Sequence, residues 1–371
     1  MSGVMRSLYI HIPFCRRICT YCDFAKEVAH DPKQHRYIDA LIDETRAHSA
    51  ILSSVRTVYI GGGTPSSLPL HLLERYLSEL NAHLSKDAVE EFTVEANPSD
   101  VTPQFAALIR RMNITRVSLG AQTFDNATLA FLNRDHHAEM IGEAVKNLRT
   151  AGLTNINVDM IFAYPAQTHA QLREDLKKLL ALKPAHISYY NLIFEPGTRL
   201  YTLYTRGETF PLDDDTQAQM YETVIDTLKD AGYTHYEISS FARKGFNSAH
   251  NTYVWRDYDY LGLGSGAHSK YGNVRYENPA RLKHYLQAVE MKREVKIPYP
   301  YETPTDTMLM GMRLLEGIDL EIFAIRFQQS VYDAYPFIKD YIAHGLLRVQ
   351  DGRLQLTRRG LLMGNEIFAR F

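Results

Sequence analysis

Short runs of β-branched and aromatic residues alternate with longer amphipathic stretches through the first half of the chain. Six of these runs predict strands, at Leu8–Ile12, Thr57–Ile60, Glu91–Ala96, Arg116–Gly120, Asn155–Ile161 and His186–Tyr190. The stretches between them have helical periodicity, for example at Tyr37–Ala50, Pro69–Leu84, Ala138–Ala151 and Ala170–Leu182. Strands separated by helices predict an α/β fold with a parallel sheet. Six repeats within about 190 residues favour a partial (β/α)6 barrel of TIM type over a closed eight-stranded one.

The segments that follow the candidate strands are unusually rich in polar residues, glycine and proline. They read HIPFCRRICTYCDF, GGGTPSS, EANPSD, AQTFDN and AYPAQT, whereas helix-to-strand connections such as AGLTN are plain. In barrels of this kind the chemistry is located at the carboxyl ends of the strands. We therefore expect the functional site at this edge of the sheet.

The chain has three cysteines, Cys15, Cys19 and Cys22, and all lie in the segment after the first candidate strand. An odd number of clustered cysteines does not form a disulfide framework, so a metal centre in a reducing compartment is the better interpretation. A [4Fe–4S] cluster held by three thiolates has one iron without a protein ligand, where S-adenosylmethionine (SAM) can bind and be cleaved reductively. The alternative is a zinc site, with His11 or Asp23 as the fourth ligand.

Composition and charge narrow the class of protein. Hydrophobic residues make up 45% of the chain and charged residues 23%, as in ordinary globular proteins. The formal net charge of −2 gives no general attraction to nucleic acid. No apolar run is long enough for an integral membrane segment, and the first residues lack a signal-peptide pattern. We expect a cytoplasmic location.

The pattern changes after about residue 195, and three regions are expected: 1–195, 196–300 and 301–371. The middle region contains a helix near Asp215–Ala231, a strand at Tyr236–Ser239 and a loop-rich segment, HNTYVWRDYDYLGLGSGAHSKYG. The last region is helical from about Pro304 and ends in GLLRVQDGRLQLTRRGLLMGNEIFARF, which predicts strand, tight turn, strand and helix. This α+β extension resembles a winged helix, but without a basic recognition surface it is not predicted to bind DNA.

The motif YIHIPFCRRICTYCDF resembles the signature of the HemN/HemW group of radical SAM proteins, and the likeness extends from Leu8 to the end of the chain. It implies a radical SAM barrel with a [4Fe–4S] cluster on the three cysteines. It also implies that SAM is contacted by Tyr9, Tyr21, Gly62, Gly63, Thr64, Glu95, Gln122, Arg134 and Asp159. The segment IFAYPAQT departs from the group, because Ala163 and Ala166 stand where the group usually has glycines.

Three kinds of protein in this group are candidates for this chain. A coproporphyrinogen III dehydrogenase would have a fourth cysteine two residues after the third, but Cys22 is followed by Asp23 and Phe24. It would also have a long N-terminal extension, whereas eight residues precede Tyr9. A methyltransferase or cyclopropanase acting on a small aromatic metabolite shares the cysteine motif. A HemW-type haem chaperone is favoured by CDF, YEISSFARKGF, HNTYVW and YLGLGSGAHS.

The resemblance to the haem chaperones implies that the chain binds and transfers haem. It favours a chaperone over an oxidoreductase, on a scaffold that is able to cleave SAM reductively. Their haem motif is HNxxYW, which HNTYVW matches at His250, Asn251 and Trp255 but with the tyrosine one position earlier. His250 and Trp255 are therefore the candidate haem contacts, provided that residues 247–260 form a surface loop. The implied partners are haem, apo-haemoprotein clients and a flavodoxin- or ferredoxin-type electron donor.

Overall fold

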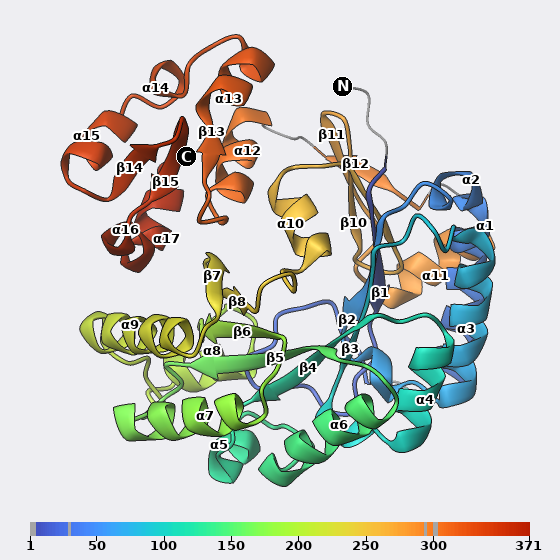
Figure 1. Ribbon diagram of the computed structural model, residues 1–371. Helices are drawn as coiled ribbons and strands as arrows, with labels where there is room; N and C mark the ends of the chain where they lie inside the picture. The colour runs from blue at the N-terminus through green and yellow to red at the C-terminus, as the bar shows by residue number, and fades with distance from the viewer. Residues whose placement is uncertain (1–4, 29–30, 293–294, 300–302) are drawn as a thin grey trace.

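The computed structural model describes residues 5–28, 31–292, 295–299 and 303–371. Six parallel strands pair side by side in the order of the sequence and form the centre of the molecule (Figure 1). They are β1 (Ser7–Ile12), β2 (Thr57–Gly62), β3 (Glu91–Ala96), β4 (Arg116–Gln122), β5 (Asn155–Phe162) and β6 (His186–Asn191). All six predicted strands are present, and the expected partial α/β barrel is confirmed.

Helices cover the outer face of these strands (Figure 1). Their apolar residues face the sheet; α3, for example, buries Leu72, Leu73 and Leu77. This burial removes apolar surface from water and is the main favourable contribution to the fold. The helices are α1 (Asp31–Ala47), α2 (Ser49–Leu52), α3 (Leu70–His83), α4 (Pro103–Arg111), α5 (Asn126–Phe131), α6 (Ala138–Thr150), α7 (His169–Ala181) and α8 (Arg199–Thr205).

Further strands extend the sheet beyond both ends of the six-stranded barrel. On one side β9 (Tyr260–Leu263) pairs parallel to β1, and β10 (His268–Tyr271), β11 (Val274–Glu277) and β12 (Ile297–Tyr299) follow as antiparallel strands. On the other side β8 (Ser240–Ala242) pairs antiparallel to β6, and β7 (Thr234–Glu237) lies outside it. Between these groups the chain forms α9 (Asp214–Asp230), α10 (Ala249–Trp255) and α11 (Leu282–Glu290).

Two predictions for the middle region are wrong in part. The strand expected at Tyr236–Ser239 is present at Tyr236 and Glu237, the last residues of β7, but the next two residues form the turn of a hairpin and β8 begins at Ser240. The expected loop at 250–272 contains helix α10 and strands β9 and β10. Helix α10 and strand β9 are stabilised by neighbours distant in sequence, Glu91 and β1, which local periodicity does not record.

The C-terminal region has its own small core beside α10 (Figure 1). A three-stranded antiparallel sheet in the order β13-β15-β14 packs with short helices, as a winged-helix-like unit does. The elements are α12 (Thr303–Gly311), β13 (Ile318–Asp319), α13 (Leu320–Phe327), α14 (Val331–Ala334), α15 (Ile338–Ala343), β14 (Leu347–Gln350), β15 (Arg353–Leu356), α16 (Arg358–Leu362) and α17 (Gly364–Phe368). The expected boundary at 300/301 lies outside the described residues, and the three-region division stays a prediction.

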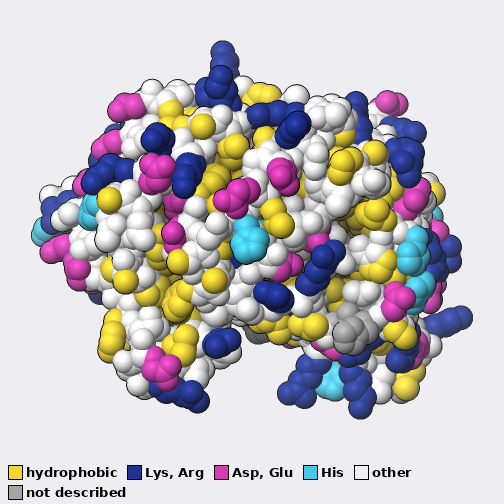
Figure 2. Space-filling view, turned by 90° about the horizontal axis from the view of Figure 1, so that it is seen from below, with side chains coloured by type: hydrophobic (Ala, Val, Ile, Leu, Met, Phe, Trp, Pro, Cys, Tyr) yellow, Lys and Arg dark blue, Asp and Glu magenta, His cyan; other side chains and the backbone are white. Residues whose placement is uncertain are grey.

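Within the described residues, none of the helices combines the length and the apolar character needed to cross a bilayer. Basic and acidic side chains are interspersed over the face shown in Figure 2, in keeping with the small net charge.

Candidate functional site

The three cysteines lie in the loop that follows β1, at the carboxyl edge of the sheet, and they form no disulfide with one another. Two side chains from elsewhere in the chain reach this loop, Thr64 after β2 and Arg134 after α5. The Thr64 hydroxyl donates to Cys15 Sγ over 3.6 Å, and Arg134 Nη1 donates to Cys19 Sγ over 3.2 Å. Burial raises the pKa of the Cys15 thiol to about 11, so that a bound metal would have to displace its proton.

The arrangement is unfavourable for the zinc alternative. Both ring nitrogens of His11 are engaged, Nδ1 with the Tyr9 hydroxyl at 3.0 Å and Nε2 with the Ala25 carbonyl at 2.7 Å. Asp23 is exposed. Among the described residues, no three His, Cys, Asp or Glu side chains converge closely enough to hold a single metal ion. A cubane needs less convergence, because each thiolate binds a different iron.

A cavity of about 410 Å3 opens beside the cysteine loop. Its volume falls in the range of roughly 300 to 1,000 Å3 that is usual for small-molecule sites. Every SAM candidate except Tyr9 lines it, together with the three cysteines: Tyr21, Gly62, Gly63, Thr64, Glu95, Gln122, Arg134 and Asp159. Tyr9 stacks on Tyr59 and bonds His11 instead. The sequence therefore brings residues from five strand ends to one cavity.

The glycines after β2 allow the chain to pass close to the cysteine loop. Gly62 has a φ of +114°, and a Cβ there would lie 2.7 Å from the His11 ring. A Cβ on Gly63 would lie 2.7 Å from the Phe14 carbonyl oxygen. Side chains at either position would collide with the loop, so the backbone is held against it, and the Gly63 and Thr64 amides donate to the carbonyls of Ile12 and Phe14.

Two carboxylates enter the cavity from β3 and β5. Glu95 accepts from the Tyr59 hydroxyl at 2.8 Å and from the Gly62 amide at 3.2 Å. Burial raises the pKa of Glu95 to about 7, with a further increase from the nearby Asp159 carboxylate and an opposing effect of the Tyr59 hydrogen bond. Asp159 accepts from Ser118 at 2.8 Å, and burial raises its pKa as well. Two carboxyls in one cavity favour a cationic ligand such as SAM, which carries a sulfonium group.

Arg134 joins the cavity to the cysteine loop. Its Nη2 donates to the Gly120 carbonyl at 2.8 Å and to Asn97 Oδ1, while Nη1 reaches Cys19. Gln122, which also lines the cavity, has a φ of +69° at an irregularity in β4. The guanidinium thus places a fixed positive charge next to the Cys19 sulfur, where it would offset the negative charge of a cluster held there.

Several lining residues were missed by the sequence reasoning, among them Tyr59, Asn97, Ser118 and Tyr190. The same rule that found Glu95 could have found Asn97, which follows β3 in the segment EANPSD. Ser118 and Tyr59 lie within strands, two positions before Gly120 and Gly61, and alternation along a strand directs them to the same interior face. Applying that alternation to every strand would have identified them.

A chain of buried hydrogen bonds connects this cavity with the opposite end of the barrel. Asn157 donates to Asp159 at 2.7 Å, His186 Nδ1 bonds Asn157 Oδ1 at 2.7 Å, and His186 Nε2 bonds the Tyr236 hydroxyl at 2.7 Å. The Tyr236 hydroxyl in turn accepts from the backbone amide of Ser248, the N-cap of α10. The barrel interior is therefore polar along its length, unlike the apolar layers that fill most barrels of this type.

His250 does not lie on a surface loop, and that expectation is wrong. It lies in α10, which is seated at the amino ends of β2 and β3, opposite the cysteines; its side chain is 5% exposed. Its Nδ1 bonds the Thr57 hydroxyl at 3.0 Å, and its backbone amide donates to Glu91 at 3.0 Å. Trp255 is half-buried, with the Arg313 guanidinium 4.5 Å from its ring centroid. The Glu91 carboxylate stabilises the amino end of this helix, which no local sequence signal reveals.

The two alanines that depart from the group's pattern both adopt the left-handed conformation, with φ of +59° at Ala163 and +60° at Ala166. A side chain in the left-handed region costs about 1 to 2 kcal/mol of steric strain. This cost is larger than the extra conformational entropy that a glycine loses on folding. Ala166 is exposed, so we expect Ala166→Gly to raise the free energy of unfolding by about 0.5 to 1 kcal/mol in a denaturant titration.

Ala163→Gly serves as the matched comparison. The Ala163 methyl is buried, at 1% exposure, so the relief of backbone strain is offset by the loss of about 0.8 kcal/mol of buried CH₂. We expect that variant to be close to neutral. A destabilised Ala166→Gly would contradict the assignment of strain.

Known proteins resemble this chain over its whole length. Residues 9–179 match the radical SAM superfamily, and residues 300–363 match the HemN C-terminal domain. "Heme chaperone HemW" of Lactococcus lactis is 37% identical over 98% of this chain and 97% of its own. The chain belongs to the HemW family of radical SAM proteins. The HemW relative from Bacillus subtilis is 34% identical and covers 99% of both chains.

The fold of this HemW-family chain also resembles that of a solved structure, coproporphyrinogen III oxidase (HemN) from Escherichia coli. It matches with a TM-score of 0.85 over all of this chain and 91% of that one, at 23% identity. The likeness confirms the barrel and the C-terminal unit. Membership of the radical SAM superfamily implies a [4Fe–4S] cluster and SAM, and the cysteine loop and its adjoining cavity fit both.

Proposed function

We propose that this HemW-family protein binds haem and passes it to apo-haemoproteins in the cytoplasm. The observation that carries the proposal is its likeness, over nearly the full chain, to relatives named heme chaperone HemW. The residues after Cys22 support it, because Phe24 stands where the dehydrogenase would have its fourth cysteine. Cys15, Cys19 and Cys22 would hold the cluster, and the cavity residues would hold SAM. When bound, the cluster supplies one-electron chemistry at its open iron.

The first test is direct. Haem added to the purified chain should give a Soret band that survives gel filtration at about one haem per chain, as a ligated haem does. Incubation of the reduced protein with SAM and coproporphyrinogen III should leave that compound unchanged. Turnover of coproporphyrinogen III would instead assign dehydrogenase activity. If the chain neither binds haem nor turns over coproporphyrinogen III, methylation or cyclopropanation of a small aromatic metabolite would be favoured.

We propose His250 and Trp255 as haem contacts under one structural condition: α10 must open. The Thr57 hydrogen bond to Nδ1 leaves Nε2 for iron, the usual division of roles in a ligating histidine. Haem binding should then increase amide hydrogen exchange in 249–255, and His250→Gln should weaken haem binding. Trp255→Phe should weaken haem binding less than His250→Gln does. Retained haem with unchanged exchange in α10 would locate the haem elsewhere.

This function requires two kinds of protein partner. The clients are apo-haemoproteins, and the electron for the cluster comes from a flavodoxin- or ferredoxin-type donor. The haem test does not depend on that donor, since binding is measured without turnover.

A further inference from the structure

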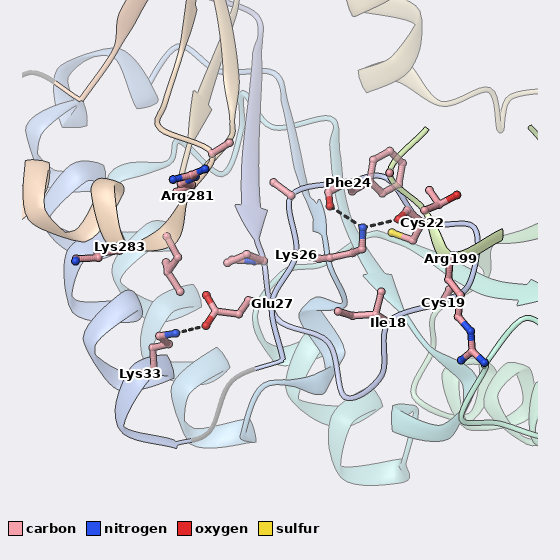
Figure 3. Close-up of a pocket in the computed structure, with 16 residues that line it drawn as sticks. Ile18, Cys19, Cys22, Phe24, Lys26, Glu27, Lys33, Arg199, Arg281 and Lys283 are labelled. Atoms are coloured by element: carbon pink, nitrogen blue, oxygen red, sulfur yellow. Dashed lines mark hydrogen bonds and ion pairs between the residues drawn. The ribbon is translucent and has the colours of Figure 1, made fainter. Parts of the chain in front are cut away.

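A second cavity lies against the outer side of the cysteine loop. We call it the cationic groove; its volume is about 750 Å3. Figure 3 shows the side chains that line it, from the cysteine loop, the start of α1, the start of α8 and the start of α11. Cys19 and Cys22 line both this groove and the SAM cavity. The loop that would hold the cluster is therefore a wall shared by the two cavities.

The groove is strongly basic although the chain as a whole has a net charge of −2. One carboxylate, Glu27, lines it, and an ion pair with Lys33 neutralises that charge. The five basic residues of the lining are Lys26, Lys33, Arg199, Arg281 and Lys283. Figure 3 shows Arg281 and Lys283 on one side of the groove and Arg199 beside the cysteines on the other. A concave surface lined by one sign of charge attracts partners of the opposite sign.

The positions of these cations are unfavourable for the fold itself. Arg199 is the first residue of α8, Arg281 is the N-cap of α11, and Lys283 lies in the first turn of α11. A positive charge at a helix amino terminus is repelled by the helix dipole, typically by about 0.3 to 1 kcal/mol. All three are exposed, and within the described part of the chain none forms an ion pair that would compensate. Stability therefore does not explain them, whereas attraction of an acidic partner does.

The apolar residues of the groove fit a protein partner. Phe24 is 64% exposed and Ile18 is 43% exposed, both on the cysteine loop. An apolar centre beside charged residues is the usual composition of a transient protein interface. A haem in the groove would have no axial ligand of the usual kinds, because the sixteen lining residues include no His, Met or Tyr and the two cysteines are cluster ligands.

We propose that the cationic groove is the docking site of the electron donor, an acidic protein that carries a flavin or an iron–sulfur centre. The donor would approach Cys19 and Cys22 from outside, so that reduction does not require SAM to leave its cavity. One electron leaves the reduced centre of the donor and is accepted by the cluster held on the three cysteines; no covalent bond forms or breaks. The inference rests on the radical SAM cluster and not on haem delivery.

The test is the rate at which reduced flavodoxin reduces the reconstituted cluster. Arg281→Glu combined with Lys283→Glu should lower the second-order rate constant at least about tenfold at low ionic strength. The difference should shrink as salt is added, because screening removes the steering. Direct binding of oxidised flavodoxin, measured by titration calorimetry, should weaken in parallel.

Matched controls separate docking from general effects. Lys86→Glu combined with Arg348→Glu changes the net charge equally at exposed positions outside the groove and should leave the rate unchanged. Photoreduced deazaflavin, a small reductant, should reduce both double variants at the same rate. Equal flavodoxin rates in the groove variant and the parent protein would overturn the proposal. Loss of haem binding with an unchanged flavodoxin rate would assign the groove to haem instead and also overturn it.

Discussion

Replacing any one of Cys15, Cys19 and Cys22 by serine should abolish the iron–sulfur cluster. Anaerobically reconstituted parent protein is expected to hold about four irons per chain, with a broad charge-transfer band that bleaches on reduction. Each variant should fall below about one iron and lose the band, because the chain has no other cysteine to take over the lost bond. Iron analysis and absorption spectra measure both effects.

Thr64→Val is the matched control for the cysteine variants. Its hydroxyl touches Cys15 Sγ at 3.6 Å, a long contact, so its loss should leave the iron content unchanged. The fold should also survive in the cysteine variants, since the β1–β6 sheet does not depend on the loop. Stoichiometric zinc in anaerobically purified protein would contradict the radical SAM assignment.

The cysteine loop also shows what sequence reasoning can recover. Strong local signals identified the strands and the edge at which they end: β-branched runs, Gly62 and Gly63, and the clustered cysteines. Parallel strands end at one edge of the sheet. Glu95 and Asp159 could therefore be placed together, although they are 64 positions apart in the sequence (159 − 95). That inference needs only the topology, and the shared cavity agrees with it.

The environment of His250 could not be recovered in the same way. HNTYVW carries a polar and β-branched mixture with no helical periodicity, which favours a loop on local grounds. The helix forms because the Glu91 carboxylate accepts from the amides of Ala249 and His250, at 2.9 and 3.0 Å. His250 and Glu91 are buried and Ala249 is half-buried, so leaving a buried one of these groups unpaired would cost about 1 to 3 kcal/mol. A contact across about 160 positions has no signature in a single sequence.

The binding of SAM should weaken about tenfold when the pH is lowered from 8 to 6. The pKa of Glu95 is raised to about 7 by burial, so its ionised fraction falls about tenfold over this interval. The ionised carboxylate would attract the sulfonium charge and accept hydrogen bonds from SAM, whereas the protonated form would do so poorly. SAM binding should therefore release protons near pH 7, which calorimetry in buffers of different ionisation enthalpy detects.

The stability of the ligand-free protein should change with pH in the opposite sense. A carboxyl whose pKa is higher in the folded than in the unfolded chain binds the proton more tightly when folded. Its contribution to stability is then largest below the ordinary glutamate pKa and decreases as the pH rises toward about 7. Chemical denaturation between pH 5 and 8 should show this decrease without SAM. Saturating SAM should largely remove it, because Glu95 is then ionised in both the folded and the unfolded chain.

Two substitutions assign this behaviour to Glu95. Glu95→Gln should weaken SAM binding at pH 8 by at least about tenfold and make it nearly independent of pH, while the iron content stays intact. Tyr59→Phe removes the 2.8 Å hydrogen bond that stabilises the ionised carboxylate, so it should shift the midpoint of the binding profile to higher pH. The pH profile of SAM binding could instead keep its midpoint in Tyr59→Phe and its slope in Glu95→Gln. That result would place the titrating group elsewhere, and Asp159→Asn would be the next variant to measure.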